Sequence, residues 1–600
     1  MRDSKLHDIL KQTFGHSDFR FDQLDIINTV LDGKDALAIM PTGGGKSICY
    51  QLPALYNDGI TLVVSPLISL MNDQVVGLRE YGVSACFLNS MQDIRQRQEA
   101  EDSILSGEVK LVYVSPEGLL SGYLLNFFRE LDINLIAIDE AHCVSQWGHE
   151  FRRDYTRLGE LKDIFPDTPV LGLTATADAK TRADIVSQLR LDNPNIFVSS
   201  FDRPNIKYSI YERGNEIIQL HDFIEKHHKK DTGIVYCLSR KKVEKVAYEL
   251  EGFGHKTVAY HAGLPKDVRT QAQDAFNRDD NIIVVATIAF GMGIDRPDVR
   301  FVAHMDLPKS IESYYQETGR AGRDGRPSNA WMIYGLQDVI KLSRMLETTD
   351  ASEAYKKVAR HKLNAMLSLC ETTLCRRQYL LNYFEEEATD ACANCDTCLE
   401  PGETWDASID AQKVLSTIYR TGQIFGAGHI VDVLRGSKNA KILERGHNKL
   451  SVYGLGKEKS KNHWNVVLRQ LLNMQYIAIT NWDYGNLALT EKSREILKNE
   501  KAFKMRKFTE TATRKSKSKA RTITSTHGRD ALFEELRDLR FSIASEKNVP
   551  SFVIFSDKSL HDMCHLMPKN REQFLLVNGV GESKCENYSE DFLKVIEDHA

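Results

Sequence analysis

The stretch DALAIMPTGGGKS, at residues 35–47, decides the fold of the N-terminal part of this chain. Its first six residues are an apolar run typical of a buried strand, and a glycine-rich turn follows them. In such a turn the backbone amides surround phosphate groups, while a lysine binds phosphate oxygens and a serine binds Mg²⁺. Met40 takes the place of the first glycine in the pattern G-x-x-x-x-G-K-[ST], so the loop is a variant. The predicted phosphate-loop residues are Thr42, Gly43, Gly44, Gly45, Lys46 and Ser47.

Similar apolar runs recur along the first half of the chain, and polar segments with helical periodicity separate them. This alternation is typical of a parallel sheet with helices on both faces. The first series is DALAIM (35–40), ITLVVSP (60–66), VKLVYVSP (109–116), NLIAID (134–139) and PVLGLTAT (169–176). The second series is TGIVYC (232–237), TVAYHAG (257–263), NIIVVAT (281–287) and VRFVAHMD (299–306). FDRPNIKY (201–208) reads as a connector, so we predict two similar α/β domains in tandem.

The composition is that of an ordinary globular protein with several domains. The 600 residues are 42% hydrophobic and 27% charged. No apolar run approaches the roughly 20 residues that cross a bilayer, and the N-terminus has no signal-peptide core. We therefore expect a cytoplasmic protein without a membrane partner. The net charge is −5, from 78 basic and 83 acidic residues. A nucleic-acid binder with this balance must gather its basic residues locally.

Two acidic residues and two arginines complete a predicted nucleotide site. Asp139 and Glu140 end an apolar run, where one carboxylate can hold Mg²⁺ and the other can position the attacking water. In the second domain the turn QETGRAGRDG (316–325) carries Arg320 and Arg323, which can stabilise charge on the transferred phosphoryl group. A site shared by two domains closes on ATP and opens on hydrolysis, which is the physical basis of a motor. The alternative for the arginine pair is a solvated basic turn.

Four of the eleven cysteines lie close together in the sequence. Cys375, Cys392, Cys395 and Cys398 follow the spacing C-x16-C-x2-C-x2-C. Four thiolates in a reducing compartment suit tetrahedral Zn²⁺ in a closed structural site. An iron–sulfur cluster is the alternative, and colour would distinguish it.

At this point an ordered set of motifs resembles the superfamily 2 helicases of the RecQ family, most of all the bacterial type. The resemblance covers essentially the whole chain and is most specific in the first 400 residues. The motifs are TFGHSDFRFDQ (13–23), MPTGGGKS (40–47), SPLISLMNDQ (65–74), DEAH (139–142), LTATA (173–177), YCLSR (236–240), YHAGL (260–264), ATIAFGMGIDRPDVR (286–300) and SYYQETGRAGRDG (313–325).

The resemblance implies an ATP-dependent DNA helicase that moves 3′→5′ on single strands. Its substrates would be duplexes, forks and recombination intermediates, in DNA repair, recombination, replication and the SOS response. It implies that Arg20 and Gln23 read adenine, with His16 where the family often has a stacking aromatic ring. Arg323 would be the arginine finger. The remaining implied nucleotide contacts are Gln316 and Arg320, and the implied Mg²⁺ ligands are Ser47 and Asp139.

The predicted architecture is α/β, with two RecA-like parallel-sheet domains and three smaller parts. The small parts are a helical zinc-binding subdomain, a winged helix and a helical HRDC domain, the last two implied by the resemblance. A polar, basic linker precedes the HRDC domain. The predicted bounds are 1–205, 206–338, 339–402, 403–505, 506–527 for the linker, and 528–600.

Predicted DNA contacts fall on three parts of the chain. The segment after the acidic pair carries Trp147, His149, Phe151 and Arg152. Stacking of bases on Trp147 or Phe151 could reposition Glu140, and the alternative is that these rings pack a domain interface. The winged helix has a basic surface, and its predicted hairpin 476–490 places Trp482 and Tyr484 where they separate strands or close a small apolar cluster. The further predicted contacts are Lys441, Arg445, Lys449 and, in the HRDC domain, Phe552.

Two other functions stay open from the residues themselves. One is an RNA-directed helicase, because DEAH-type motifs also occur there. The other is a DNA-binding or strand-annealing scaffold with a vestigial nucleotide site, which the presence of Lys46, Glu140 and Arg323 disfavours. A single-strand-binding protein and a topoisomerase are partners that the resemblance alone implies, as is association with the nucleoid.

Overall fold

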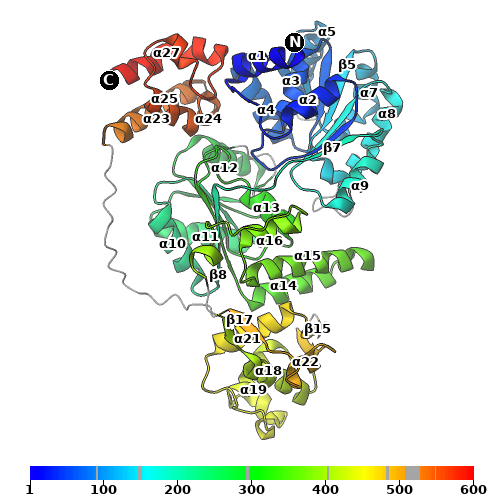
Figure 1. Cartoon of the computed structure of the whole chain (residues 1–600), viewed down its shortest axis with the longest axis vertical. Helices are drawn as coiled ribbons and strands as arrows, with labels where there is room; N and C mark the ends of the chain where they lie inside the picture. Colours follow the sequence, from blue (N-terminus) through cyan, green and yellow to red (C-terminus); the bar gives the residue numbers. More distant parts are fainter. Residues whose placement is uncertain are drawn as a thin grey trace.

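The computed structural model describes residues 1–89, 92–145, 152–291, 296–401, 404–481, 485–506, 527–547 and 549–599. Its elements form five parts, which Figure 1 shows in sequence colours. We name them the first sheet domain (2–198), the second sheet domain (206–334), the cysteine subdomain (336–399), the winged-helix domain (404–506) and the C-terminal helical domain (527–597). Within the described residues no helix combines the length and apolar character needed to span a membrane.

The first sheet domain contains a seven-stranded parallel sheet with the strand order β3-β4-β2-β5-β6-β1-β7. Its strands are β1 (Ala36–Ile39), β2 (Ile60–Val64), β3 (Ala85–Leu88), β4 (Leu111–Val114), β5 (Ile133–Ile138), β6 (Val170–Thr174) and β7 (Asn195–Val198). Its helices are α1 (Arg2–Phe14), α2 (Gln23–Leu31), α3 (Ile48–Tyr56), α4 (Ile68–Glu80), α5 (Ile94–Leu105), α6 (Pro116–Leu119), α7 (Gly122–Arg129), η1 (Ala141–Val144), η2 (Arg153–Glu160), α8 (Leu161–Ile164) and α9 (Ala179–Gln188).

The strand order of this sheet positions the candidate site. Strands β5, β6 and β1 are neighbours, and every residue of β1 and β6 is buried. Such strands read as continuous apolar runs because helices cover both faces of a parallel sheet. The carboxyl ends of the three strands lie at one edge, so the glycine-rich loop, the acidic pair and Thr174 come together there.

The second sheet domain contains a six-stranded parallel sheet with the order β10-β11-β9-β12-β13-β8. Its strands are β8 (Ile206–Glu212), β9 (Gly233–Tyr236), β10 (Thr257–Tyr260), β11 (Ile283–Ala286), β12 (Phe301–His304) and β13 (Ser328–Tyr334). Its helices are α10 (Glu216–His227), α11 (Arg240–Gly252), α12 (Lys266–Arg278) and α13 (Ile311–Thr318). The two tandem parallel sheets confirm the predicted fold class.

Four strands of the two parallel sheets are absent from the sequence-based prediction, namely β3, β7, β8 and β13. Strand β7 (NIFV) has only three apolar residues, and it lies at a sheet edge with three of its four residues exposed. Strand β8 was assigned to a connector, and β13 mixes polar and aromatic residues. These strands are specified by pairing with neighbours that the local sequence does not contain.

The cysteine subdomain is helical, as predicted, and it packs against the second sheet domain. Its helices are α14 (Leu336–Glu347), α15 (Glu353–Glu371), α16 (Arg376–Tyr383) and α17 (Asp396–Leu399). The main chain of Ile210 in β8 donates a hydrogen bond of 3.2 Å to the Asp396 carboxylate. Tyr208 of β8 also forms an isolated bridge with Cys395. The subdomain is therefore anchored on the edge strand of the second sheet.

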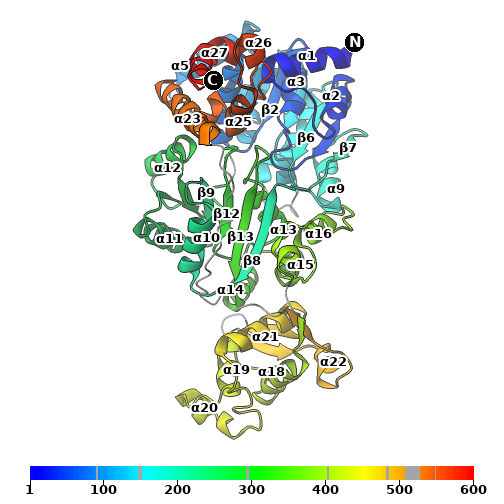
Figure 2. The ribbon, with the colours of Figure 1, turned by 60° about the vertical axis from the view of Figure 1, so that its left-hand side comes forward.

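The winged-helix domain surrounds a core that includes the fully buried Trp464. Its helices are α18 (Ser408–Arg420), α19 (Ala427–Leu434), α20 (Ala440–Glu444), η3 (His447–Lys449), α21 (Lys461–Asn473) and α22 (Ser493–Leu497). Its strands are β14 (Thr404–Asp406), β15 (Ile477–Asn481), β16 (Asn486–Leu489) and β17 (Lys504–Arg506). The antiparallel pairing of β15 with β16 confirms the predicted hairpin. Figure 2 shows this domain at the opposite end of the molecule from the first sheet domain.

The C-terminal helical domain packs against both sheet domains (Figures 1 and 2). Its helices are α23 (His527–Lys547), α24 (Ser551–Ile554), α25 (Asp557–Leu566), α26 (Arg571–Phe574) and α27 (Glu582–Glu597). On the first sheet domain, Tyr588 donates a hydrogen bond of 2.5 Å to Glu80. On the second, Arg537 forms an ion pair of 2.9 Å with Asp280. The predicted linker falls almost entirely outside the described residues.

Candidate active site

The glycine-rich loop connects β1 to α3, and its backbone requires glycine at two positions. Gly43 and Gly45 have φ angles of +78° and +79°, which side chains with a Cβ rarely adopt. The Lys46 ammonium donates a hydrogen bond of 3.3 Å to the carbonyl of Met40, at the start of the loop. This turns the lysine back across the loop, where phosphate oxygens would replace the carbonyl as its partner.

Gln23, one of the side chains predicted to read adenine, contacts this loop. Gln23 begins α2, and its amide donates hydrogen bonds to the carbonyls of Gly45 at 2.8 Å and Gly44 at 3.3 Å. Its oxygen accepts from the backbone N–H of Arg20 at 2.8 Å. Burial lowers the pKa of His16 to about 4, and the charges of Arg20 and Lys558 act in the same direction. The imidazole is therefore neutral at neutral pH, which suits stacking on a base.

The acidic pair follows β5 directly. Glu140 has a φ angle of +49°, a strained conformation for a residue with a side chain and one typical of functional sites. Burial, together with the neighbouring charge of Glu140, raises the pKa of Asp139 to about 7, while Lys46 opposes the rise. A lysine charge acting on a buried carboxyl places the loop and the acidic pair in one electrostatic environment.

The Glu140 carboxylate is linked to the end of β6. It lies 3.3 Å from Nδ1 of His142, and the same nitrogen lies 2.8 Å from the hydroxyl of Thr174. His142 is fully buried. The side chains of Thr174 and His142 thus connect the end of β6 with Glu140.

The turn 316–325 of the second sheet domain packs directly on the glycine-rich loop. A Cβ added at Gly43 would lie 3.3 Å from the Cα of Arg323, and one added at Gly319 would lie 2.0 Å from the hydroxyl oxygen of Thr42. Arg320 is buried. The arginine pair is therefore part of the cleft and not a solvated surface turn. Only a glycine at position 319 permits this close approach.

Arg203 joins the two sides of the cleft, and it was missed in the sequence analysis. Its buried guanidinium donates to the carbonyl of Thr42 at 2.6 Å and to those of Gly319, Ala321 and Gly322 at 2.9–3.0 Å. The residue lies in FDRPN, which the sequence analysis treated as a connector. Its position in the sequence, between the two predicted nucleotide-binding domains, is the feature that could have identified Arg203.

The aromatic segment after the acidic pair lies largely outside the described residues, which end at 145 and resume at 152. Trp147, His149 and Phe151 belong to that gap. Arg152 is described, and its guanidinium donates a hydrogen bond of 2.8 Å to the carbonyl of Pro66, before α4. Its backbone N–H donates to the carbonyl of Cys143 at 2.9 Å. The two ends of the segment are thus fixed beside the acidic pair.

The donor set fits Mg²⁺, which prefers oxygen ligands and usually needs only one or two carboxylates beside substrate phosphates. Asp139 supplies a buried carboxylate, and burial first and the negative charge of Glu140 second raise its pKa. Ser47, at the N-terminus of α3, supplies a hydroxyl. A divalent cation between the loop and the acidic pair would offset the excess charge.

The four predicted zinc ligands converge in the cysteine subdomain. The sulfur atoms of Cys375, Cys392, Cys395 and Cys398 all lie within 4.8 Å of one another. The pairs Cys392–Cys398 and Cys375–Cys395 are each 4.0 Å apart. Zinc–sulfur bonds of about 2.3 Å in a tetrahedron place sulfurs about 3.8 Å apart, so the cluster fits the ion.

A buried ion pair joins two residues that directly follow cysteines of the cluster. Arg376 follows Cys375, Asp396 follows Cys395, and their side chains meet at 2.5 and 2.8 Å. Arg376 also donates to the carbonyl of Leu369 at 2.6 Å. Each ligand-bearing segment is thereby fixed to the other and, through Asp396, to β8.

The other predicted DNA contacts lie at the two extremities of the molecule. Lys441 lies in α20, Arg445 follows it and Lys449 ends η3, all far from the sheet domains (Figure 2). Trp482 and Tyr484 fall outside the described residues. Phe552 lies half-buried in α24, which packs near α4.

Family models match five consecutive parts of the chain. Two are the DEAD/DEAH box helicase model, at residues 20–185, and the helicase conserved C-terminal domain, at 215–325. The next two are RecQ zinc-binding, at 336–399, and the RQC domain, at 401–514. The last is the HRDC domain, at 529–596. The zinc-binding model and the sulfur geometry identify the cysteine cluster as a zinc site and not an iron–sulfur centre.

Curated relatives match over almost the full chain, and each carries the description ATP-dependent DNA helicase RecQ. The Haemophilus influenzae protein is 46% identical and the match covers 98% of this chain and 95% of that protein. The Pasteurella multocida protein is 45% identical, over 99% and 93%. The Bacillus subtilis protein is 38% identical, over 99% and 98%. This chain belongs to the RecQ family of ATP-dependent DNA helicases.

Proposed function

We propose that the cleft between the two sheet domains hydrolyses ATP, and that the resulting opening and closing moves the protein 3′→5′ along single-stranded DNA. The observation that carries this proposal is the contact of the turn 316–325 with the glycine-rich loop, joined by Arg203. ATP bound to the loop would lie between the two domains. The change of charge at the terminal phosphate would then alter the contact between them.

Within the cleft we assign a role to each group. The loop amides and Lys46 hold the phosphates, Ser47 and Asp139 hold Mg²⁺, and Glu140 positions the attacking water. When bound, Mg²⁺ neutralises charge on the phosphate oxygens. Arg323 stabilises the charge of the transferred phosphoryl group, with Arg320 beside it. Gln23, Arg20 and His16 select adenine, and Gln23 would exchange its loop carbonyls for the base edge. Gln316, Thr42 and the three loop glycines complete the nucleotide contacts.

The DNA-facing assignments support the coupling of hydrolysis to movement. We propose that Trp147, His149, Phe151 and Arg152 contact the single strand, and that Lys441, Arg445 and Lys449 contact the duplex. Trp482 and Tyr484 would meet the junction, and Phe552 a single strand. The path from Arg152 through Cys143 to the Glu140 segment is short, because a backbone hydrogen bond of 2.9 Å closes it. Binding of DNA would therefore adjust Glu140 and accelerate hydrolysis.

The biological setting follows from the family. The names of the bacterial relatives specify DNA, and this favours a DNA helicase over an RNA-directed one. We propose forks, duplexes and recombination intermediates as substrates, in DNA repair and recombination. A single-strand-binding protein and a topoisomerase are proposed partners, in the cytoplasm at the nucleoid.

The experiment that tests this function measures ATP hydrolysis with and without single-stranded DNA, together with unwinding of 3′-tailed and 5′-tailed duplexes. We expect stimulation by the single strand and unwinding of the 3′-tailed duplex alone. Lys46→Ala should abolish both activities and retain DNA binding, because the ammonium contacts nucleotide and not DNA. Lys34→Ala removes an exposed lysine near the same strand and should leave both activities unchanged.

Two results would contradict the proposal. The first is hydrolysis by the wild-type protein that single-stranded DNA does not accelerate, which would favour a scaffold with an unused nucleotide site. The second is unwinding by Lys46→Ala at the wild-type rate, which would place the energy source outside the loop.

A further inference from the structure

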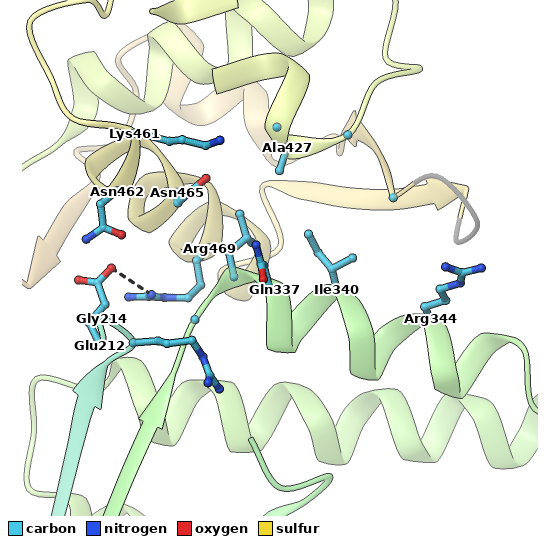
Figure 3. Close-up of a pocket in the computed structure, with 16 residues that line it drawn as sticks. Glu212, Gly214, Gln337, Ile340, Arg344, Ala427, Lys461, Asn462, Asn465 and Arg469 are labelled. Atoms are coloured by element: carbon cyan, nitrogen blue, oxygen red, sulfur yellow. Dashed lines mark ion pairs between the residues drawn. The ribbon is translucent and has the colours of Figure 1, made fainter. Parts of the chain in front are cut away.

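A cavity lies where the second sheet domain and helix α14 of the cysteine subdomain face the winged-helix domain, far from the candidate ATP cleft. Figure 3 shows it between helix α14 below and helices α19 and α21 above. Its volume is about 510 Å³, which is in the range of ligand sites. The lower wall is formed by the end of β8 and the start of α14, and the upper wall by the first turns of α19 and by α21. Gly485, on the hairpin side, closes one end.

The ionisable side chains of the cavity are mostly basic, namely Arg213, Arg344, Lys461 and Arg469 against Glu212. Glu212 forms an ion pair of 3.6 Å with Arg469 (Figure 3), and Arg213 is paired with Asp338 at 2.9 Å. Lys461 is exposed and forms no ion pair with any residue that the structure describes. Lys461 therefore gives the cavity a positive charge that is not offset locally.

The remaining polar side chains of the cavity are amides, which can donate hydrogen bonds as well as accept them. Asn465 and Gln337 present side-chain amides from opposite walls (Figure 3). The first turn of α19, which begins Gly426-Ala427-Gly428 and has no side-chain cap, also lines the cavity. Small residues there leave the backbone amides accessible, and the helix dipole adds a positive potential. None of the described residues that line the cavity is aromatic, so these residues offer a base no ring on which to stack.

We infer that this cavity receives a phosphodiester group of DNA at the point where the strand passes from the winged-helix domain to the motor. The inference rests on the proposed function. A cation, amide donors and a helix start recognise a phosphate, whereas a base would require an aromatic platform. Because both domains supply the walls, the contact is made only by DNA that spans both. The ligand that we assign to the cavity is therefore a phosphate at the junction of a tailed duplex.

The test measures the dissociation constant of a 3′-tailed duplex, without nucleotide, as a function of salt. Affinity falls as salt rises, and Lys461→Ala should make the plot of log affinity against log salt less steep by about 0.9. This amounts to about eightfold weaker binding at 0.1 M salt. Lys461→Arg should restore most of the affinity because it keeps the charge. Lys498→Ala is the matched control on the same domain, since that side chain is 65% exposed and lies outside the cavity. It should bind as the wild type does.

A second pair of variants separates charge from shape. A Cβ added at Gly428 meets no atom within 4 Å, so a longer side chain can enter the cavity without disturbing the fold. Glutamate is also favoured in the first turn of a helix. Gly428→Glu should weaken binding of the tailed duplex more than Lys461→Ala does, because it adds repulsion. Gly428→Gln has nearly the same size and should stay within about twofold of the wild type.

Three results would overturn the inference. The first is wild-type affinity and wild-type salt dependence in both Lys461→Ala and Gly428→Glu. The second is a loss of affinity in Lys498→Ala as large as that in Lys461→Ala. The third is a loss of affinity in Gly428→Gln as large as that in Gly428→Glu. These outcomes are distinct from failure of the proposed function. That failure would appear in the wild-type protein, as hydrolysis without stimulation by single-stranded DNA.

Discussion

At the scale of single residues, Arg203 is the side chain on which the geometry of the cleft most depends. One guanidinium satisfies carbonyls from the glycine-rich loop and from the turn 316–325. Arginine is suited to this because its planar fork carries five donors, whereas a lysine ammonium offers three from one point. Arg203 therefore holds the two sides of the cleft together through the hydrogen bonds of one side chain.

We predict that Arg203→Ala lowers ATP hydrolysis by more than tenfold. Each buried carbonyl left without a donor costs about 1–3 kcal/mol, and a loss of about 1.4 kcal/mol in the closed arrangement already lowers the rate tenfold. The measurement is the single-strand-stimulated turnover number at saturating ATP. Arg190→Ala is the control, because Arg190 is 54% exposed and, among the described residues, forms an ion pair with Asp163 alone. An Arg203→Ala protein with wild-type turnover would show that the connector does not set the cleft.

Residue identities in the cleft were predictable only where a motif carries them. Lys46, Asp139 and Arg323 occupy patterns whose chemistry is specific. The contacts of Gln23 with loop carbonyls and of Arg203 with four carbonyls depend on backbone atoms, which a sequence pattern does not describe. The same is true of the strained φ angle of Glu140.

At the scale of elements, apolar runs predicted nine of the thirteen strands of the two parallel sheets. They missed three edge strands, β3, β7 and β8, and the interior strand β13. Strand β1 is buried throughout and appears as ALAI, whereas β7 is exposed and pairs only with β1. A strand buried on both faces must be apolar, but an edge strand is specified by its neighbour. The cysteine subdomain was predictable for a different reason, because metal ligands impose a spacing on the sequence.

We predict that Cys395→Ser abolishes zinc binding and loosens the attachment of the cysteine subdomain to β8. Cys395 is fully buried, bridges to Tyr208 and precedes Asp396. Zinc content by atomic absorption should fall from about one to zero per chain, and the subdomain should become sensitive to protease, since binding free energy of a structural zinc is folding free energy. Cys86→Ala alters a buried cysteine outside the cluster and should keep its zinc. Full zinc content in Cys395→Ser would refute the ligand assignment.

At the scale of the whole molecule, the C-terminal helical domain bridges the two sheet domains whose opening and closing we propose. Gly579 donates a backbone hydrogen bond of 3.0 Å to Gly15, next to His16, and Lys584 lies 4.1 Å from the centre of the Tyr81 ring. These contacts join residues that are far apart in the sequence. They are made by main-chain groups and by a lysine and a tyrosine side chain, which follow no sequence motif. The sequence predicted the domain but held no pattern for its position.

We predict that Gly581→Ala releases this domain from the first sheet domain. A Cβ at Gly581 would lie 2.2 Å from the carbonyl oxygen of Thr13, although the backbone at this position accepts alanine. The radius of gyration from small-angle scattering should increase. Gly77→Ala is the matched control, since a Cβ there meets no atom within 4 Å. An unchanged scattering curve for Gly581→Ala would show that the interface does not depend on this close approach.

The central claim is that the two sheet domains form one ATP site, to which the second domain contributes Arg323. The most direct test is the single-strand-stimulated rate of ATP hydrolysis by Arg323→Ala, with nucleotide affinity measured in parallel. An arginine that acts on the transition state contributes about 10³-fold or more, so we expect that loss with ATP still bound. Arg326→Ala, three residues further along the chain, should hydrolyse ATP at the wild-type rate. Wild-type hydrolysis by Arg323→Ala would contradict the claim.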